Sequence, residues 1–360
     1  MSTTTARPAA GHGARVPAGA APGPLRGEAP GRKQAAWLLA AVVVLVLLAA
    51  ASLAVGARDV PLATVWQALT GFDPGNGDHA VVQARIPRTV LGLLAGAALG
   101  LAGAAMQGVA RNPLADPGII GVNAGAALAV VTGIYVFGIT GFAGYVWFAF
   151  AGAAAAAVVV YLVASLGREG ATPVKLALAG AALSAGLSSL MNIILVSSQD
   201  TLDRFRFWQV GGVAGRDWSV LLPGLPFLAA GALVVLLAGR TLNGLALGED
   251  IARGLGQRVG LSRAVIALGI VLLCGTATAL AGPIGFVGLV VPHAVRFLTG
   301  PDYRWILPFS LIAAPALLLG ADIFGRVVLL PGEVPAGIMT ALLGAPVFVW
   351  LIRRGKGAGL

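Results

Sequence analysis

Of the 360 residues in this chain, 58% are hydrophobic and only 11% are charged. A water-soluble globule of this size needs more polar surface, so lipid must surround most of the chain. The formal net charge of +10 at pH 7 does not indicate a nucleic-acid-binding protein, because the basic residues are scattered between apolar runs and form no stripe with aromatic residues. The composition predicts an integral membrane protein.

The N-terminal segment 1–34 is rich in Ala, Pro and Gly and carries scattered basic residues. It offers almost nothing apolar to bury, so we expect a disordered basic tail. The apolar run that follows, 35–56, is longer than a signal-peptide core of roughly 7 to 15 residues. We therefore expect this run to remain as the first membrane span.

Further apolar stretches follow along the chain, and a helix that crosses the ~30 Å hydrocarbon core needs roughly 20 residues. The run 264–299 is too long for one crossing, and Gly282, Pro283 and Gly285 supply a break. We predict an all-α integral membrane domain over 35–354, with about ten transmembrane helices. The predicted spans are 35–56, 89–110, 119–139, 144–166, 174–198, 219–239, 263–281, 284–299, 306–325 and 335–352.

The distribution of basic residues orients this bundle. With ten spans and the basic tail inside, most of the 24 Lys and Arg residues fall on the cytoplasmic side, as the positive-inside rule expects. Both termini are then cytoplasmic. The basic residues that fall on the outer side are informative because they oppose the positive-inside tendency. They are Arg58, Arg85, Arg88, Arg204, Arg206, Arg216 and Arg326.

Two glycine-rich segments share one spacing pattern. Gly96–Gly103 ends in Leu-Ala-Gly and is followed by Pro113, and Gly275–Gly282 ends in the same way and is followed at the same distance by Pro292. The segments belong to the second and seventh spans, so the two halves of the chain would be inverted in the membrane, as in many transporters. Chance similarity between Ala- and Gly-rich helices is the alternative.

The acidic residues all fall in the tail, in loops or near span ends, with Asp322 closest to a span interior. Carriers driven by ion gradients usually hold ionisable groups inside the bundle, so a secondary carrier is disfavoured but stays an alternative. The chain has no phosphate loop ending in Gly-Lys-Ser/Thr, so we expect no ATP hydrolysis by this chain. A membrane enzyme is disfavoured too, since no His, Cys or carboxylate constellation falls at one depth. We expect no catalytic residue, metal site or cofactor in this chain.

The segment between the sixth and seventh spans carries Leu247, Ile251 and Leu255 at four-residue spacing. This pattern predicts a short amphipathic helix. Glu249 and Arg253 are placed to pair on its other side. The apolar stripe either lies back on the protein's own bundle or docks on a partner, and the pattern alone leaves both readings open.

The chain resembles the FecCD-type permeases of ATP-binding-cassette importers for ferric siderophores, haem and cobalamin, over roughly residues 36–354. No single motif is diagnostic, and the resemblance rests on the order and spacing of short stretches. They are Arg85–Arg88, Gly103–Gln107 running into Asn112–Gly118, Gly211 and Gly212 with Trp218, Leu247–Gly256, Gly282–His293, Ala321–Arg326 and Gly344–Phe348.

The resemblance implies two docking regions. The cytoplasmic segment 247–256 looks like the family's coupling segment, which inserts into a cleft of the ATPase subunit. Arg85, Arg88 and Arg326 match positions that face outward and pair with acidic residues of the substrate-binding protein, a role that suits the planar guanidinium. Simple anchoring of helix ends at the head groups is the alternative for these arginines. The expected coupling residues are Leu247, Gly248, Glu249, Ile251, Ala252, Arg253, Leu255 and Gly256.

The resemblance also suggests which residues line the pathway. Ser184, Ser188 and Asn192 form a polar stripe in the fifth span, and the corresponding helix lines the family's pathway. Gln107 and Asn112 are further candidates. Such residues often hydrogen-bond a neighbouring helix or their own backbone, which is the alternative.

Aromatic and basic residues alternate in 203–216, which indicates an outer interfacial helix. The resemblance implies a second permease chain, identical or paralogous, two ATPase subunits that bind ATP-Mg, and an external substrate-binding protein. We expect a ferric siderophore as cargo, with haem or cobalamin as the alternative.

Overall fold

The computed structural model describes residues 30–139, 142–166 and 172–355. Within these residues the chain is helical and contains no strand. The helices are α1 (Pro30–Ala54), α2 (Leu62–Thr70), α3 (Gly77–Val109), η1 (Pro117–Ile120), α4 (Val122–Phe137), α5 (Phe142–Ala164), α6 (Pro173–Ser197), α7 (Gln199–Gln209), α8 (Trp218–Leu221), η2 (Leu222–Gly224), α9 (Leu225–Leu237), α10 (Gly239–Ala246), α11 (Glu249–Gly254), α12 (Val259–Ala281), α13 (Val287–Thr299), α14 (Tyr303–Val327) and α15 (Ala336–Gly355).

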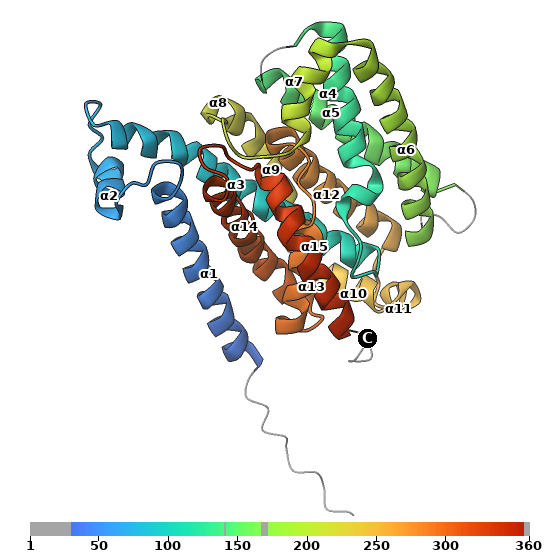
Figure 1. The fold of residues 1–360 in the computed structure, drawn as a ribbon. Helices are drawn as coiled ribbons and strands as arrows, with labels where there is room; N and C mark the ends of the chain where they lie inside the picture. The colour runs from blue at the N-terminus through green and yellow to red at the C-terminus, as the bar shows by residue number, and fades with distance from the viewer. Residues whose placement is uncertain (1–29, 140–141, 167–171, 356–360) are drawn as a thin grey trace, which may run out of the picture.

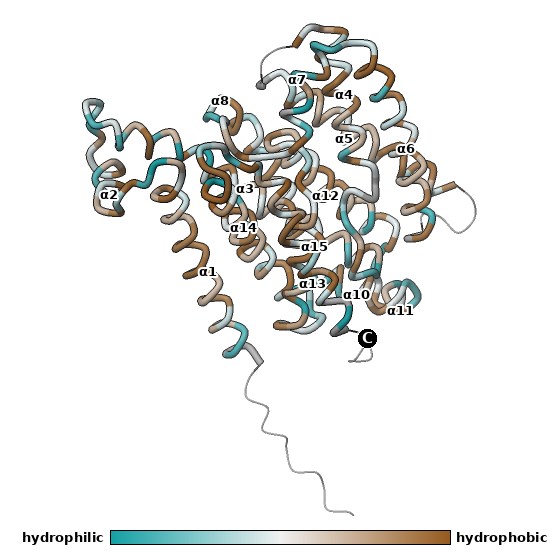
Figure 2. Tube along the Cα trace, in the orientation of Figure 1, coloured by the Kyte–Doolittle hydropathy of each residue, from teal (hydrophilic) through white to brown (hydrophobic). Residues whose placement is uncertain are grey.

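Seven helical segments in the described part of the chain are long and apolar enough to cross a membrane. They lie in α1, α3, α5, α6, α8 to α9, α12 and α14, and the shorter apolar helices are α4, α13 and most of α15. Figure 2 shows hydrophobic residues along the lengths of α1 and α6 and hydrophilic residues around α11. The predicted multi-pass helical membrane protein is confirmed.

Two predicted boundaries differ from the structure. Residues 30–34 belong to α1 and not to the tail, while 1–29 lie outside the described residues. The helix α3 starts at Gly77, well before the expected 89, because the Asn76 side chain caps it by accepting from the Asp78 amide at 2.9 Å. Arg85 and Arg88 are therefore helical residues and not loop residues.

The predicted break near Gly282 is present. The helix α12 ends at Ala281, and Gly282 takes a φ of 75°, a conformation that favours glycine. The matching Gly103 of the other glycine-rich segment stays inside α3, which continues to Val109. The two segments therefore share a spacing pattern without sharing a local structure at this position.

The buried centre of the bundle is formed by α3, α12 and α14, and α1 and α6 lie at its edges (Figure 1). Small residues allow the central helices to approach closely. At Gly96 an added Cβ would lie 2.8 Å from the backbone nitrogen of Pro315 in α14, and at Gly103 it would overlap the backbone of Gly288 in α13. The high glycine content thus serves helix packing.

Figure 1 shows which helices lie at each end of the bundle. The start of α1 and the end of α15 lie at one end, together with α10 and α11. The helices α2, α7 and α8 lie at the other end. The expected interfacial helix differs in extent and exposure: α7 ends at Gln209, and Phe205 and Trp208 are buried in the core. Burial against other helices, rather than head-group contact, accounts for these two aromatic residues.

Candidate functional site

The short helix α11 lies where the sequence predicts the coupling segment. Acidic residues occupy its first turn and Arg253 its last, which suits the helix dipole. Gly248 and Gly256 flank the helix with φ of 113° and 80°, values that favour glycine. These two glycines set how the chain enters and leaves α11.

The apolar stripe of this segment points away from the protein's own core. Leu247, Ile251 and Leu255 are 62%, 52% and 65% exposed, whereas Ala252 on the opposite face is buried. The described part of the bundle leaves the stripe uncovered. A contiguous row of large exposed apolar side chains is typical of a surface that another protein covers.

Glu249 ties α11 to the bundle. One carboxylate oxygen lies 2.7 Å from Arg263 of α12 and 3.8 Å from Arg111, which follows α3, and the other lies 3.0 Å from Arg253. The expected pair between Glu249 and Arg253 is therefore present. The less screened contact is the one to Arg263, whose side chain is only 11% exposed. The carboxylate links α11 to the start of α12 and the end of α3.

The electrostatics of Glu249 favour its charged form. Partial burial alone would raise the pKa of this carboxyl, but the hydrogen bond and charge of Arg263, with the charges of Arg253 and Arg111, outweigh burial and lower its pKa. Glu249 is therefore ionised at neutral pH, and its links to the three arginines are ion pairs.

A second charged cluster lies at the opposite end of α3. Arg88 donates through Nε and Nη2 to the Asp322 carboxylate of α14, at 3.0 and 2.8 Å, and through Nη1 to Glu333 at 2.7 Å. Asp322 also accepts from Arg326, one turn further along α14. The side chains of Asp322 and Arg326 are each 1% exposed, while Glu333 is 35% exposed. We call Arg85, Arg88, Asp322, Arg326 and Glu333 the arginine cluster.

The arginine cluster also fastens the end of α1. Arg326 donates to the carbonyl of Ser52 at 2.6 Å, and Arg85 donates to the carbonyls of Leu53 and Ala54, both at 2.9 Å. These are among the last α1 carbonyls, which no helical amide reaches. The side chains thus hold a largely exposed helix against α3 and α14.

This geometry changes the expectation for Arg326. We expected all three arginines to face outward, but the guanidinium of Arg326 is enclosed by Asp322 and the end of α1. Arg85 and Arg88 keep partial exposure. A partner that meets this structure reaches Arg85 and Arg88, with Arg326 behind them.

Two of the expected pathway residues have local structural roles in this conformation. Gln107 is buried, donates to the carbonyl of Leu289 at 3.1 Å and accepts from Arg296 at 3.3 Å, so it joins α3 to α13. Asn112 accepts from the amide of Leu114 at 2.9 Å and stabilises a turn. The alternative reading, internal hydrogen bonding, describes both side chains.

The other expected pathway residues lie on α6. Ser184 and Ser188 are half-buried and Asn192 is exposed. Ser184 lies beside Gly121, directly after η1. The middle of the exposed face of α6 consists of small residues, namely Ala181, Ala182, Ala185, Gly186 and Ser189, and the large residues Leu178, Leu190 and Ile193 are exposed around them.

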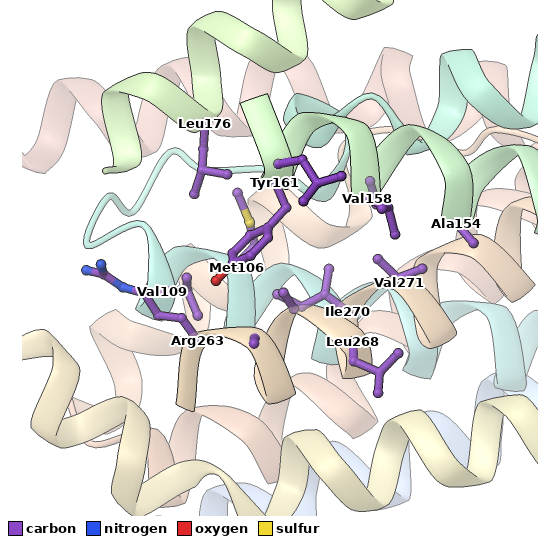
Figure 3. A pocket seen from close by; sticks show the side chains of 14 residues that line it. Met106, Val109, Ala154, Val158, Tyr161, Leu176, Arg263, Leu268, Ile270 and Val271 are labelled. Carbon is purple, nitrogen blue, oxygen red and sulfur yellow. The ribbon is translucent and has the colours of Figure 1, made fainter. Parts of the chain in front are cut away.

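An apolar cavity of about 250 Å³ lies between α3, α5, α6 and α12 (Figure 3). Met106, Tyr161 and Ile270 line it, and Arg263 lies at its edge. Because Arg263 also contacts Glu249, the cavity adjoins the anchor of α11. Val158, Leu162 and Leu268 of its lining are 56%, 60% and 56% exposed, so the cavity opens at the surface of the bundle.

The described residues contain no group of three His, Cys, Asp or Glu side chains that could hold a metal ion. The sequence reasoning missed Arg263, Arg111 and Glu333 as partners of the predicted residues. No local pattern connects these residues to their partners, because each contact joins residues of different elements. The pair of Asp322 and Arg326 was missed as well, although their spacing of four on one helix is visible in the sequence.

A bundle with helices long and apolar enough to cross a membrane, with an exposed apolar stripe at one end and a charged cluster at the other, is that of a multi-pass membrane protein. The chain belongs to the FecCD transport family, whose model matches residues 43–354. The resemblance found in the sequence is thereby confirmed, and the chain is a membrane permease of the importer type that this family comprises.

Relatives with curated descriptions share most of their length with this chain. The ferric enterobactin transport system permease protein FepD of Escherichia coli (strain K12) is 46% identical over 88% of this chain and 95% of its own length. The Fe(3+)-citrate import system permease protein YfmD of Bacillus subtilis (strain 168) is 40% identical over 88% and 94%.

A solved structure described as an inward-facing conformation of a metal-chelate type ABC transporter is also similar. It is 30% identical, with a TM-score of 0.77, over 89% of this chain and 99% of that one. The helical arrangement of this chain is therefore that of an ABC transporter membrane subunit.

Proposed function

We propose that this permease imports ferric siderophore complexes and is driven by separate ATPase subunits that dock on α11. The observation that carries the proposal is the exposed row of Leu247, Ile251 and Leu255 on a helix that Glu249 anchors to the bundle. An uncovered apolar stripe suits insertion into a cleft of another protein, and an anchored helix transmits the movement of that protein.

The coupling route follows from the ion pairs of Glu249. Closure of two ATPase subunits around ATP-Mg pulls on α11, and Glu249 passes this displacement to Arg263 at the start of α12 and to Arg111 at the end of α3. Both helices belong to the buried centre, so the bundle changes between outward- and inward-facing packings.

The proposed topology has ten crossings in an inverted repeat with both termini in the cytoplasm. The start of α1 and the end of α15 lie at the same end of the bundle as α11, which supports this topology. The arginine cluster then faces outward. Acidic residues on the substrate-binding protein would meet Arg85 and Arg88, with Arg326 supporting them from behind.

The transport pathway requires a second permease chain in this proposal. The exposed small residues of α6 suit close approach of another helix. Ser184, Ser188 and Asn192 lie next to that face and line the pathway between the two chains. The sequence of one chain leaves open whether the second copy is identical or paralogous.

The cargo assignment is supported by the relatives, which are named for enterobactin and for iron citrate. A haem permease of Yersinia pestis is 35% identical over 88% of this chain, so haem remains the second candidate within the family, with cobalamin after it. A self-energised secondary carrier is the remaining alternative.

Uptake by cells tests the proposal. We would compare radiolabelled ferric siderophores, haem and cobalamin in cells carrying the wild type, Ile251→Ser with Leu255→Ser, or the control Leu39→Ser, with surface expression measured in parallel. Leu39 is 66% exposed on α1 and belongs neither to α11 nor to the arginine cluster. We expect ferric siderophore uptake to fall only in the α11 variant.

Unchanged uptake in the α11 variant at normal expression contradicts docking through this helix. Uptake of haem or cobalamin without uptake of ferric siderophores would support the same mechanism with a different cargo.

A further inference from the structure

A polar cavity of about 220 Å³ opens beside the arginine cluster. It brings Arg88 and Arg216 together with Asp322 and Glu333. Arg216 belongs to the connection between α7 and α8, and Glu333 to the connection between α14 and α15. Four chain segments that are distant in sequence thus place two guanidinium groups and two carboxylates around one space.

The two carboxylates differ in how firmly they are held. Asp322 is 1% exposed and contacts both Arg88 and Arg326, so its removal would leave two enclosed guanidinium groups without their counter-ion. Glu333 is 35% exposed and contacts Nη1 of Arg88 at 2.7 Å. The Glu333 contact is therefore the replaceable one of the two.

The backbone that follows Glu333 is fixed, while the Glu333 side chain lies at the rim of the cavity. The amide of Val334 donates to the carbonyl of Gly325 at 2.9 Å, and the amide of Gly337 donates to the carbonyl of Gly211 at 3.1 Å. Rotation of the side chain alone therefore moves the Glu333 carboxylate off Arg88, and the loop keeps its place.

The surroundings favour a carboxylate at this position. Arg85, Arg88 and Arg326 interact electrostatically with one another, and Arg216 lies across the cavity. These four positive charges exceed the three negative charges of Asp322, Glu333 and Asp59, the last of which acts on Arg85. A carboxylate that takes the place of Glu333 keeps the charge-assisted hydrogen bond to Arg88 and gains the attraction of the remaining positive charge.

Resting on the proposed function, we propose that Glu333 occupies in the free permease the position on Arg88 that a carboxylate of the substrate-binding protein takes on docking. The cavity is the seat of that carboxylate, and Glu333 competes with it. The binding protein can use this position only in permease molecules in which Glu333 has left it. The apparent affinity of docking is therefore the intrinsic affinity multiplied by the fraction of such molecules. Glu333 thereby weakens docking and favours release of the binding protein after transfer.

The affinity of docking tests this competition. The permease with its ATPase subunits is placed in nanodiscs, and the dissociation constant is measured for a soluble form of the substrate-binding protein that delivers the ferric siderophore. We expect Glu333→Gln to bind roughly two- to five-fold more tightly than the wild type. The matched control is Asp203→Asn on α7, which removes an exposed carboxylate at the same end of the bundle without lining the cavity.

The control variant is expected to bind with wild-type affinity. Unchanged or weaker binding by Glu333→Gln overturns the proposal, and so does equal tightening by both variants, which would reflect a general gain of positive charge. The proposed docking face fails separately if Arg88→Gln binds as tightly as the wild type, with thermal melting of each variant recorded alongside.

Discussion

Asp322 is both the counter-ion of two arginines and a link between helices at the end of the bundle that carries the arginine cluster. It lies within hydrogen-bonding distance of Arg88 and contacts Arg326, and Arg326 in turn holds the carbonyl of Ser52 at the end of α1. All these groups are removed from solvent to a large degree. One carboxylate therefore links α3 to α14 directly and α1 to both through Arg326.

Neutralising this carboxylate should destabilise the protein strongly. We expect Asp322→Asn to cost about 3 to 5 kcal/mol, because breaking a buried pair leaves uncompensated charge. Thermal unfolding in detergent measures the effect, with the exposed Asp203→Asn as control at under about 0.5 kcal/mol. A melting temperature equal to that of the wild type would contradict the assigned role of Asp322.

Glu249 makes the anchoring of α11 dependent on pH in a definite direction. Its arginine partners lower its pKa, so anchoring favours the ionised carboxylate. The contribution is fully present above the ordinary carboxyl pKa of about 4.3. It is lost only as the pH falls through the lowered pKa.

A fluorescent probe at Leu255→Cys measures this dependence by anisotropy, since the single native cysteine, Cys274, is buried. We expect constant probe mobility from neutral pH down to the ordinary carboxyl range, and greater mobility below it. Glu249→Gln should show the mobile probe at every pH. An increase in probe mobility near neutral pH in the protein that retains Glu249 would refute the anchoring role of Glu249.

At the scale of the helices, glycine contacts set the spacing of the buried centre. An added methyl group on Gly103 would overlap the backbone of Gly288, so α3 and α13 must separate. In contrast, an added Cβ on Gly320 of α14 meets no atom within 4 Å. The two helical glycines form a matched pair for substitution.

We expect Gly103→Ala to destabilise the protein by about 1 to 3 kcal/mol through overpacking. Gly320→Ala should be neutral or slightly stabilising, because it gains helix propensity without a clash. Differential scanning in detergent compares the two. Equal melting temperatures would mean that α3 and α13 do not pack as closely as the structure has them.

The helices themselves were largely predictable from the sequence. Long apolar runs and glycine or proline breaks are local signals, and the break at Gly282 and the helix in 247–256 were found from them. The early start of α3 was missed because the cap at Asn76 lies in a polar stretch that hydropathy does not register.

The contacts within the candidate site were less predictable. Arg326 was expected to face outward from the predicted topology and from the family resemblance, but tertiary contacts with Asp322 and the end of α1 enclose it. Gln107 and Phe205 were likewise assigned from residue type, and packing against other helices determines their burial. Hydropathy and spacing predict elements, whereas pairing between distant segments appears only in the folded chain.

At the scale of the whole molecule, the two charged regions lie at opposite ends of α3. Glu249 and its arginine partners lie at the end that carries α11, and the arginine cluster lies at the other. The buried helix α3 connects them directly. The proposed coupling between the two ends would therefore run along α3.

Transport in proteoliposomes tests this account most directly. Vesicles containing the permease and its ATPase subunits receive binding protein loaded with a ferric siderophore on one side and ATP-Mg on the other. The account predicts accumulation of the siderophore only with both ATP-Mg and binding protein, and its loss in Ile251→Ser with Leu255→Ser. Accumulation driven by a proton or sodium gradient through the permease alone would contradict the account.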